Sequence, residues 1–147
     1  MPVCMIQVHG TSVAWNGAAL LLRGPPGSGK SDLALRLIEA GAGLIADDQT
    51  CLTVRKGKLY ASVPPPIVGL LEIRGVGIVK VAAAPPAPLA LVVDLVSYED
   101  LERSPEPAHC AYLGVTLPRI CLVPFEAAAV AKLRHAMPAN QDGGCAA

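Results

Sequence analysis

The sequence is poor in aromatic side chains and has no excess of charge of either sign. Phenylalanine, tyrosine and tryptophan make up 3% of the 147 residues, and 12 basic residues balance 12 acidic ones. Single-stranded nucleic acid is usually held by stacked aromatic rings, and nucleic acids in general by a basic surface. The composition therefore predicts no nucleic-acid partner, and zero net charge predicts no attraction to an anionic membrane.

The chain also lacks segments that would direct it to a membrane. Residues 1–9 have neither the basic start nor the apolar centre of a signal peptide, and no apolar run approaches membrane-spanning length. The 5 cysteines are scattered and include no C-x-x-C pair. This pattern favours reduced thiols in a cytoplasmic protein.

What the chain does contain is the glycine-rich segment G-P-P-G-S-G-K-S, which matches the phosphate-binding loop G-x-x-x-x-G-K-[ST]. In that motif backbone amides surround phosphate, the lysine binds the outer phosphates and the hydroxyl binds Mg²⁺. A plain glycine-rich turn is the alternative. An apolar strand candidate precedes the segment and helical periodicity follows it, which is the order the motif requires. The ATP-binding candidates are Gly24, Pro25, Pro26, Gly27, Ser28, Gly29, Lys30 and Ser31.

The rest of the chain reads as short strands joined by tight turns, so we predict an α/β fold. Asn16-Gly17 predicts a hairpin whose second strand leads into the loop, and Arg55-Lys56-Gly57-Lys58 predicts another. The length and the apolar share of 52% predict one core. We expect a mixed sheet with antiparallel hairpins and flanking helices, forming one P-loop kinase domain over residues 1–137 and a disordered tail over 138–147.

Further expectations concern the second half of the chain. Leu89 to Val93 is the clearest buried strand, and residues 97–117 read as irregular apart from a helical turn at 98–103. Leu117 and Ile120 to Val123 are candidates for a last strand. The alanine-rich segment 125–136 predicts a last helix, with Phe125 among the side chains available for packing.

Phosphoryl transfer to a hydroxyl needs acidic groups for the metal and for the proton, and two places offer them. Asp94 ends the strand candidate 89–93, as a generic search for a metal-binding aspartate would require. Asp47 and Asp48 follow a shorter apolar run. Because adjacent side chains of a strand point to opposite sides, one could serve Mg²⁺ and the other an acceptor, which favours the pair. Alternatively, the two aspartates begin and cap a turn.

The segment Leu71 to Gly77 alternates apolar and charged residues. On a strand, Glu72 and Arg74 would share one face. That face could be solvated, with an ion pair worth less than about 1 kcal/mol. It could also bring Glu72 to the metal and Arg74 to a phosphoryl group.

Four stretches together resemble, in order and spacing, the catalytic domain of the HPr kinase/phosphorylases: His9-Gly10, the loop 24–31, Ala46-Asp47-Asp48 and L-E-I-R-G-V-G-I at 71–78. The loop alone is generic, whereas its combination with D-D and E-I-R-G-x-G-I is specific. The likeness covers residues 6–123 and implies a fold related to phosphoenolpyruvate carboxykinase. It also implies an ATP-dependent protein serine kinase acting on HPr, the phosphocarrier of the bacterial phosphotransferase system, and reversing the step by phosphorolysis.

The resemblance implies a role for each matching residue. Asp48 would accept the proton in phosphorylation and donate it in reversal, with Asp47 beside it as a metal or water partner. Lys30 would bind phosphates, while Ser31 and Glu72 would hold Mg²⁺. The expected partners are ATP, an HPr-type phosphocarrier and further copies of the chain, assembled as a hexamer.

Two more residues and two differences complete the comparison with the family. His9 matches the active histidine of the family, which changes its interpretation from a structural residue to a catalytic one, and Arg103 lies where members carry an active arginine. The resemblance begins with the catalytic domain, so we expect a short form like the members without the N-terminal domain. Pro124-Phe125-Glu126 stands where members usually carry Pro-Gly-Arg, a segment associated with dephosphorylation, so phosphorylase activity is an open question.

Two other functions fit the phosphate loop alone. A kinase of a small metabolite would need a lid, and the sequence contains no arginine-rich lid segment. A non-catalytic protein that senses ATP would tolerate the loss of Asp48, whereas a protein kinase would not.

Overall fold

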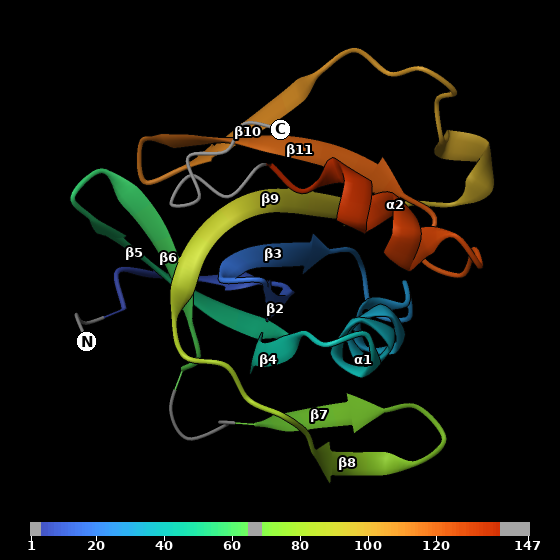
Figure 1. Ribbon diagram of the computed structural model, residues 1–147, viewed down its shortest axis with the longest axis horizontal. Helices are drawn as coiled ribbons and strands as arrows, with labels where there is room; N and C mark the ends of the chain where they lie inside the picture. The colour runs from blue at the N-terminus through green and yellow to red at the C-terminus, as the bar shows by residue number, and fades with distance from the viewer. Residues whose placement is uncertain (1–3, 65–68, 139–147) are drawn as a thin grey trace.

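One strongly curved mixed sheet carries most of the chain in this computed structural model, which describes residues 4–64 and 69–138 (Figure 1). The strands are β1 Ile6–His9, β2 Thr11–Trp15, β3 Ala18–Arg23, β4 Gly43–Ala46, β5 Gln49–Arg55, β6 Lys58–Ser62, β7 Leu70–Ile73, β8 Gly77–Lys80, β9 Ala87–Leu95, β10 Ala108–Tyr112 and β11 Val115–Leu122. The helices are α1 Lys30–Glu39, the short 3₁₀ helix η1 Tyr98–Asp100 and α2 Ala129–Ala136. Within the described ranges, no helix has the length and apolar character needed to cross a membrane.

The strand directions bring several strand ends to one edge of the sheet. The main order is β1-β5-β6-β9-β3-β2-β4, and β11 pairs with both β9 and β10. Strands β3 and β11 run parallel to β9, whereas β2 is antiparallel to both β3 and β4. Strand β4 therefore points the same way as β3. The C-terminal ends of β3, β4, β9 and β11 meet at the edge where ligands bind in open α/β sheets.

Strand β3 is buried on both faces, which explains its unbroken apolar run. Leu20 and Leu22 pack with α1 and α2, while Leu21 packs on the other face with β5 and β6. All three are fully buried, because alternate side chains of a strand point to opposite faces. The residues that follow β3 therefore leave a rigid, central element.

Both predicted hairpins are confirmed. Asn16 and Gly17 join β2 to β3, and Lys56 and Gly57 join β5 to β6, all four with positive φ. Two consecutive residues of positive φ form the turn that matches the twist of antiparallel strands. The predicted strand at 89–93 is also confirmed, within the longer β9.

Two expectations for the second half were wrong. Residues 97–117 are not irregular throughout, because β10 and the start of β11 pair there as a hairpin. The last helix begins at Ala129 and not at residue 125, and Phe125, which was expected to be available for packing, is 67% exposed. The last strand expected at Leu117 and Ile120 to Val123 is found as β11, which ends at Leu122 and pairs with the distant strand β9.

The expectation of reduced thiols was also wrong for two cysteines. Cys4 and Cys51 form a disulfide across a sequence separation of 47 residues. Pairing of β1 with β5 brings these positions together, so spacing along the chain gives no signal for it. Residues 139–147, where a disordered tail was predicted, lie outside the described residues, and the domain bounds stay a prediction.

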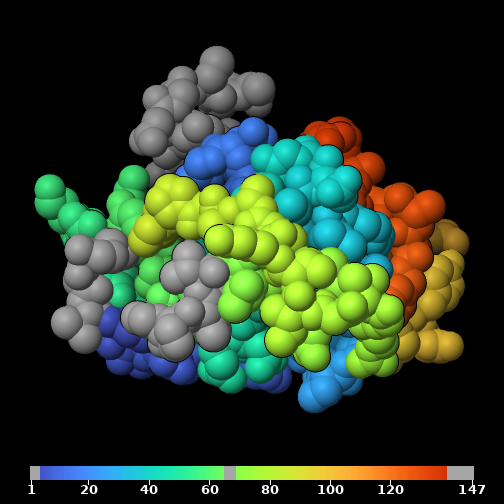
Figure 2. Space-filling view, turned by 90° about the horizontal axis from the view of Figure 1, so that it is seen from below, coloured from blue at the N-terminus to red at the C-terminus, as the bar shows by residue number. Residues whose placement is uncertain are grey.

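Strands β7 and β8 form a separate two-stranded sheet outside the main one. The hairpin lies beside α1, and the view from below shows both on the same surface (Figure 2). Leu71 anchors it in the core under α1, whereas Glu72 and Arg74 are not buried. Glu72 and Arg74 are therefore exposed to solvent on a hairpin that lies beside α1, the helix that begins at the phosphate loop.

Candidate active site

The phosphate loop connects the end of β3 to the first residue of α1. Lys30 is only 8% exposed, and its ammonium donates hydrogen bonds to the carbonyl oxygens of Gly24 (2.7 Å) and Pro25 (3.1 Å). These bonds hold the lysine inside the loop. Its charge and the positive end of the α1 dipole therefore act on the same place, as an anion site at a helix N-terminus requires.

Glycine is required at two positions of the loop. Gly27 (φ 81°) and Gly29 (φ 102°) have the left-handed backbone that favours residues without a Cβ. A Cβ on Gly29 would also lie 2.8 Å from a ring carbon of Phe125, closer than real contacts allow. Backbone shape and close packing both explain the glycine spacing of the motif.

Asp47 joins the loop to two other parts of the chain. Its Oδ1 accepts hydrogen bonds from the hydroxyls of Ser31 (3.2 Å) and Thr11 (3.0 Å). Its Oδ2 accepts the backbone N–H of Glu72 (3.1 Å). Thr11 begins β2 at the edge where β4 ends, because these strands are antiparallel. One carboxylate thus contacts the loop, the sheet edge and the β7–β8 hairpin.

Asp48 points to a different partner. Its Oδ1 lies 2.7 Å from Nε2 of His9, and its backbone N–H donates to the Thr11 hydroxyl at 3.1 Å. Asp48 has a positive φ of 68°, which turns its side chain away from that of Asp47. The two carboxylates therefore have different partners, but Asp47 and Asp48 lie in the bend between β4 and β5 and not on a strand, which agrees with the alternative of a turn. We call Thr11, Ser31, Asp47, Asp48 and His9 the Asp47–Asp48 cluster.

Strand pairing and a close backbone approach bring His9 to Asp48. His9 ends β1 opposite Gln49, the first residue of β5. The N–H of the next residue, Gly10, donates to the Asp48 carbonyl at 2.7 Å. A Cβ on Gly10 would lie 2.8 Å from the Leu21 side chain. Glycine therefore allows the chain to pass close to β3 between His9 and Thr11.

The remaining predicted site residues differ in how close they lie to the loop. Arg74 is next to it, since a Cβ on Gly27 would be 3.6 Å from a guanidinium nitrogen of Arg74. Glu72 reaches Asp47 through its backbone, while its own side chain is exposed. Arg103 is exposed between η1 and β10, and no polar contact joins it to the other described residues.

Asp94 has a very different environment from the Asp47–Asp48 cluster. Arg23 binds both of its oxygens (2.7 and 2.8 Å), Arg119 binds one of them (2.7 Å), and Arg23 also donates to the Tyr112 hydroxyl (2.9 Å). Burial alone would raise the pKa of Asp94, but the hydrogen bonds from the two arginines outweigh it and lower that pKa below its ordinary value. We call Arg23, Asp94, Tyr112 and Arg119 the Asp94 cluster.

Sequence reasoning missed Thr11 and both arginines. Thr11 lies 36 residues from Asp47 and Arg23 lies 71 residues from Asp94. No local motif marks either contact, because each depends on which strands pair. An arginine at the end of the strand that precedes the loop was the one available signal for the Asp94 cluster.

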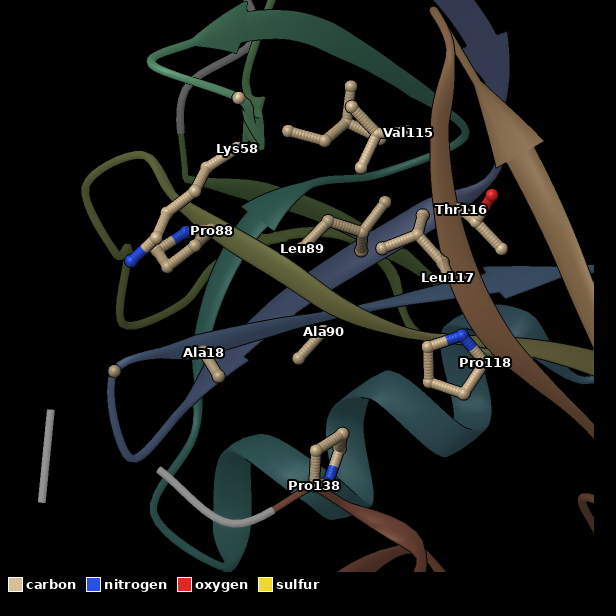
Figure 3. Close-up of a pocket in the computed structure, with 13 residues that line it drawn as sticks. Ala18, Lys58, Pro88, Leu89, Ala90, Val115, Thr116, Leu117, Pro118 and Pro138 are labelled. Carbon is tan, nitrogen blue, oxygen red and sulfur yellow. The ribbon is translucent and has the colours of Figure 1, made fainter. Parts of the chain in front are cut away.

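A surface hollow lies away from this edge. It has a volume of about 430 Å³ and opens near Ala18, the first residue of β3, whereas the phosphate loop follows the last (Figure 3). Leu89, Val115 and Leu117 line it, and Lys58 is the one charged residue among the described residues that do so. This lining offers neither a phosphate cradle nor a carboxylate, so the loop edge is the better candidate for chemistry.

The oxygen atoms near the loop fit a magnesium ion. Mg²⁺ is usually held by one or two carboxylates together with substrate phosphates and water. The Ser31 hydroxyl and the Asp47 carboxylate, 3.2 Å apart, are oxygen donors of this kind. In the described part of the chain no three His, Cys, Asp or Glu residues cluster as a complete metal site. A metal here would therefore depend on the nucleotide for the remaining ligands.

This fold and this edge define an α/β protein with a P-loop kinase core. The chain belongs to the family of HPr Serine kinase C-terminal domains, whose pattern matches residues 4–124. The predicted fold class and the family resemblance are thereby confirmed.

Curated relatives and a solved structure are similar to this chain. HPr kinase/phosphorylases from Cupriavidus metallidurans and Geobacillus thermodenitrificans are 35% and 34% identical over 84% and 78% of it. A third, from Clostridium botulinum, is 41% identical over 51%. The chain spans 41% of the length of each of the first two and 25% of the third. The Hpr(Ser) kinase/phosphatase from Coxiella burnetii has a TM-score of 0.77 over 89% of this chain and 97% of its own, at 24% identity, a likeness of fold.

Proposed function

We propose that this chain is an ATP-dependent protein kinase domain that transfers the γ-phosphoryl group of ATP to a serine of HPr. One observation carries the proposal: a continuous set of hydrogen bonds leads from the Ser31 hydroxyl through Asp47 and Thr11 to Asp48. A triphosphate held by the loop would therefore lie close to a carboxylate that is 64% exposed. The relatives named HPr kinase/phosphorylase support HPr as the acceptor.

In this mechanism Asp48 is the proton acceptor. Its carboxylate takes the proton of the seryl hydroxyl while the seryl oxygen forms a bond to the γ-phosphorus. The bond from that phosphorus to the bridging oxygen of the β-phosphate breaks, and ADP leaves. His9, at 2.7 Å, holds the Asp48 carboxylate in position. Lys30 and the loop amides bind the phosphate oxygens, and Arg74 is close enough to Gly27 to assist them.

The residues expected to hold Mg²⁺ are Ser31 and Asp47, with Glu72 of β7 as a further oxygen donor. When bound, the ion would supply positive charge that offsets the charge developing on the transferred phosphoryl group. Asp47 also keeps its hydrogen bond to Thr11, which in turn receives the N–H of Asp48. The metal-binding and proton-accepting positions are thus adjacent without sharing a carboxylate.

Several finer features are also part of the proposal. The reverse step would transfer the seryl phosphate to inorganic phosphate and release pyrophosphate, with Asp48 donating the proton. Arg103 would act from its exposed loop on a bound acceptor. The chain would form a homo-oligomer, such as a hexamer, since Val76 and Ile78 leave apolar side chains exposed on the β7–β8 hairpin. We place this activity in the cytoplasm, where ATP is available.

The decisive experiment is incubation of the chain with γ-labelled ATP, Mg²⁺ and HPr. We expect the label on a serine of HPr, none on HPr whose acceptor serine is replaced by alanine, and strongly reduced transfer by Lys30→Ala and by Asp48→Asn. Pyrophosphate release from phosphoseryl HPr and inorganic phosphate is measured separately. Labelling of a small metabolite instead of HPr would favour a metabolite kinase. ATP binding without transfer to any acceptor would favour an ATP sensor.

A further inference from the structure

Phe125 is the only phenylalanine of the chain, and its side chain is 67% exposed. Its ring edge lies against Gly29, the last glycine of the phosphate loop: a Cβ built there would be 2.8 and 3.2 Å from two ring carbons. Among the described residues Trp15 is buried, and Tyr112 is bonded to Arg23. Phe125 is therefore an exposed aromatic ring in direct contact with the phosphate loop.

The segment that carries Phe125 is held firmly on both sides. Arg36, in the body of α1, donates hydrogen bonds to the carbonyl oxygens of Pro124 and Glu126, the two neighbours of Phe125. The Glu126 carboxylate also pairs with Lys132 of α2 at 2.5 Å. The backbone around the ring is thus fixed to both helices. Because the backbone on both sides of this exposed side chain is already fixed, a ligand that contacts the ring would cause little further loss of conformational entropy.

The place of the ring indicates what it binds. Phosphates held by the loop amides and by Lys30 leave the sugar and base of a nucleotide to extend beyond the loop. The inner side is closed, since Leu22 of β3 and Leu95 of β9 are buried in the core there. The base must therefore lie on the outer side, where Phe125 is exposed.

We propose that Phe125 is the platform on which the base of the nucleotide stacks, an inference that rests on the proposed function. Aromatic stacking is favourable for any base, because every base has a π-face. Phe125 would therefore strengthen binding of nucleoside triphosphates without selecting among the bases. The phosphate loop would bind the triphosphate part independently of it.

The test compares two ligands, Mg-ATP and Mg-tripolyphosphate, by calorimetry in the absence of HPr. We expect Phe125→Ala to weaken ATP binding about 5- to 140-fold, the effect of losing one stacked base, and to leave tripolyphosphate binding within about 2-fold. Phe125→Leu, which keeps an apolar contact with Gly29 but has no ring, should also weaken ATP binding. Phe125→Tyr should retain it. Tyr98→Ala, which removes an exposed aromatic ring on η1, is the matched control and should change neither ligand.

Each outcome bears on the proposal. Equal loss of both ligands in Phe125→Ala would show that the ring supports the loop and would overturn it, as would unchanged ATP binding. Wild-type protein that binds tripolyphosphate as tightly as ATP would show that no base site exists. If ATP binding depends on Phe125 but HPr receives no phosphate, the stacking platform stands and the kinase proposal fails. If HPr is phosphorylated and Phe125→Ala binds ATP normally, only the platform fails.

Discussion

The Asp47–Asp48 cluster and the Asp94 cluster lie at the same edge of one sheet but surround their carboxylates differently. The Asp48 side chain is 64% exposed and has one imidazole beside it. The Asp94 side chain is 23% exposed and is bound by two guanidinium groups. A general base must be accessible to the substrate and must accept a proton. The Asp94 carboxylate lies between two arginines that lower its pKa, so its charge is better suited to stabilising the fold. Position at a strand end is therefore not sufficient to identify a catalytic carboxylate.

The largest expected effect tests which carboxylate is the base. Asp48→Asn should lower the rate of phosphoryl transfer to HPr by about 100- to 10,000-fold, the usual contribution of general-base catalysis. Asp94→Asn should stay within about 3-fold of wild type at a temperature where both are folded. Single-turnover kinetics with saturating ATP measure both. An inactive Asp94→Asn together with an active Asp48→Asn would reverse the two assignments.

The next effect concerns the disulfide between Cys4, just before β1, and Cys51 of β5. His9 ends β1, and Asp48 directly precedes β5. Cys51→Ser should lower the free energy of unfolding by about 2–4 kcal/mol, because the disulfide closes a long loop in the unfolded chain. Reducing agent should destabilise the wild type by a similar amount and leave Cys51→Ser unchanged, as urea unfolding will show. Cys121→Ser, at an exposed free thiol, is the control. We expect transfer activity to persist after reduction, since strand pairing still aligns His9 with the start of β5.

A smaller loss of stability is expected in the second cluster. Asp94→Asn leaves Arg23 and Arg119 facing each other without the carboxylate that neutralises them. This should cost about 1.5–3 kcal/mol, as for lost hydrogen bonds to a charged group. Urea unfolding measures it, with Glu106→Gln, on an exposed loop, as the control. Equal stability of the two variants would mean that the Asp94 cluster contributes nothing to folding.

The smallest effect is the pH dependence of that contribution. The pKa of Asp94 is lower in the folded protein than its ordinary value, so its contribution is complete above about pH 4, the ordinary aspartate value, and is lost as pH falls through the lower pKa of the folded state. The difference in unfolding free energy between wild type and Asp94→Asn should therefore be constant from pH 7 to pH 5 and shrink below pH 4. A difference that grew on acidification would contradict the ion-pair explanation.

Local patterns predicted the parts of the fold that depend on neighbouring residues. The hairpin turns at Asn16-Gly17 and Lys56-Gly57 need only two adjacent residues that tolerate positive φ, and both were found. Helix α1 and the buried core of β9 also followed from short apolar patterns. The β10–β11 hairpin was missed because its polar residues show no clear alternation. Phe125 was expected to be available for packing but is mostly exposed, because apolar character does not show which side of the chain faces solvent.

The sequence by itself determined the phosphate loop, since glycine spacing, lysine and hydroxyl act within one short segment whose backbone is set by its own residues. It also determined that residues 9, 48 and 72 match one family. Only the tertiary structure decided how these residues meet. Thr11 bridges Asp47 and Asp48, and two arginines bind the Asp94 carboxylate, because strand pairing joins positions that are far apart in the chain. The environment of a carboxylate depends on such contacts, so its chemistry is a property of the fold.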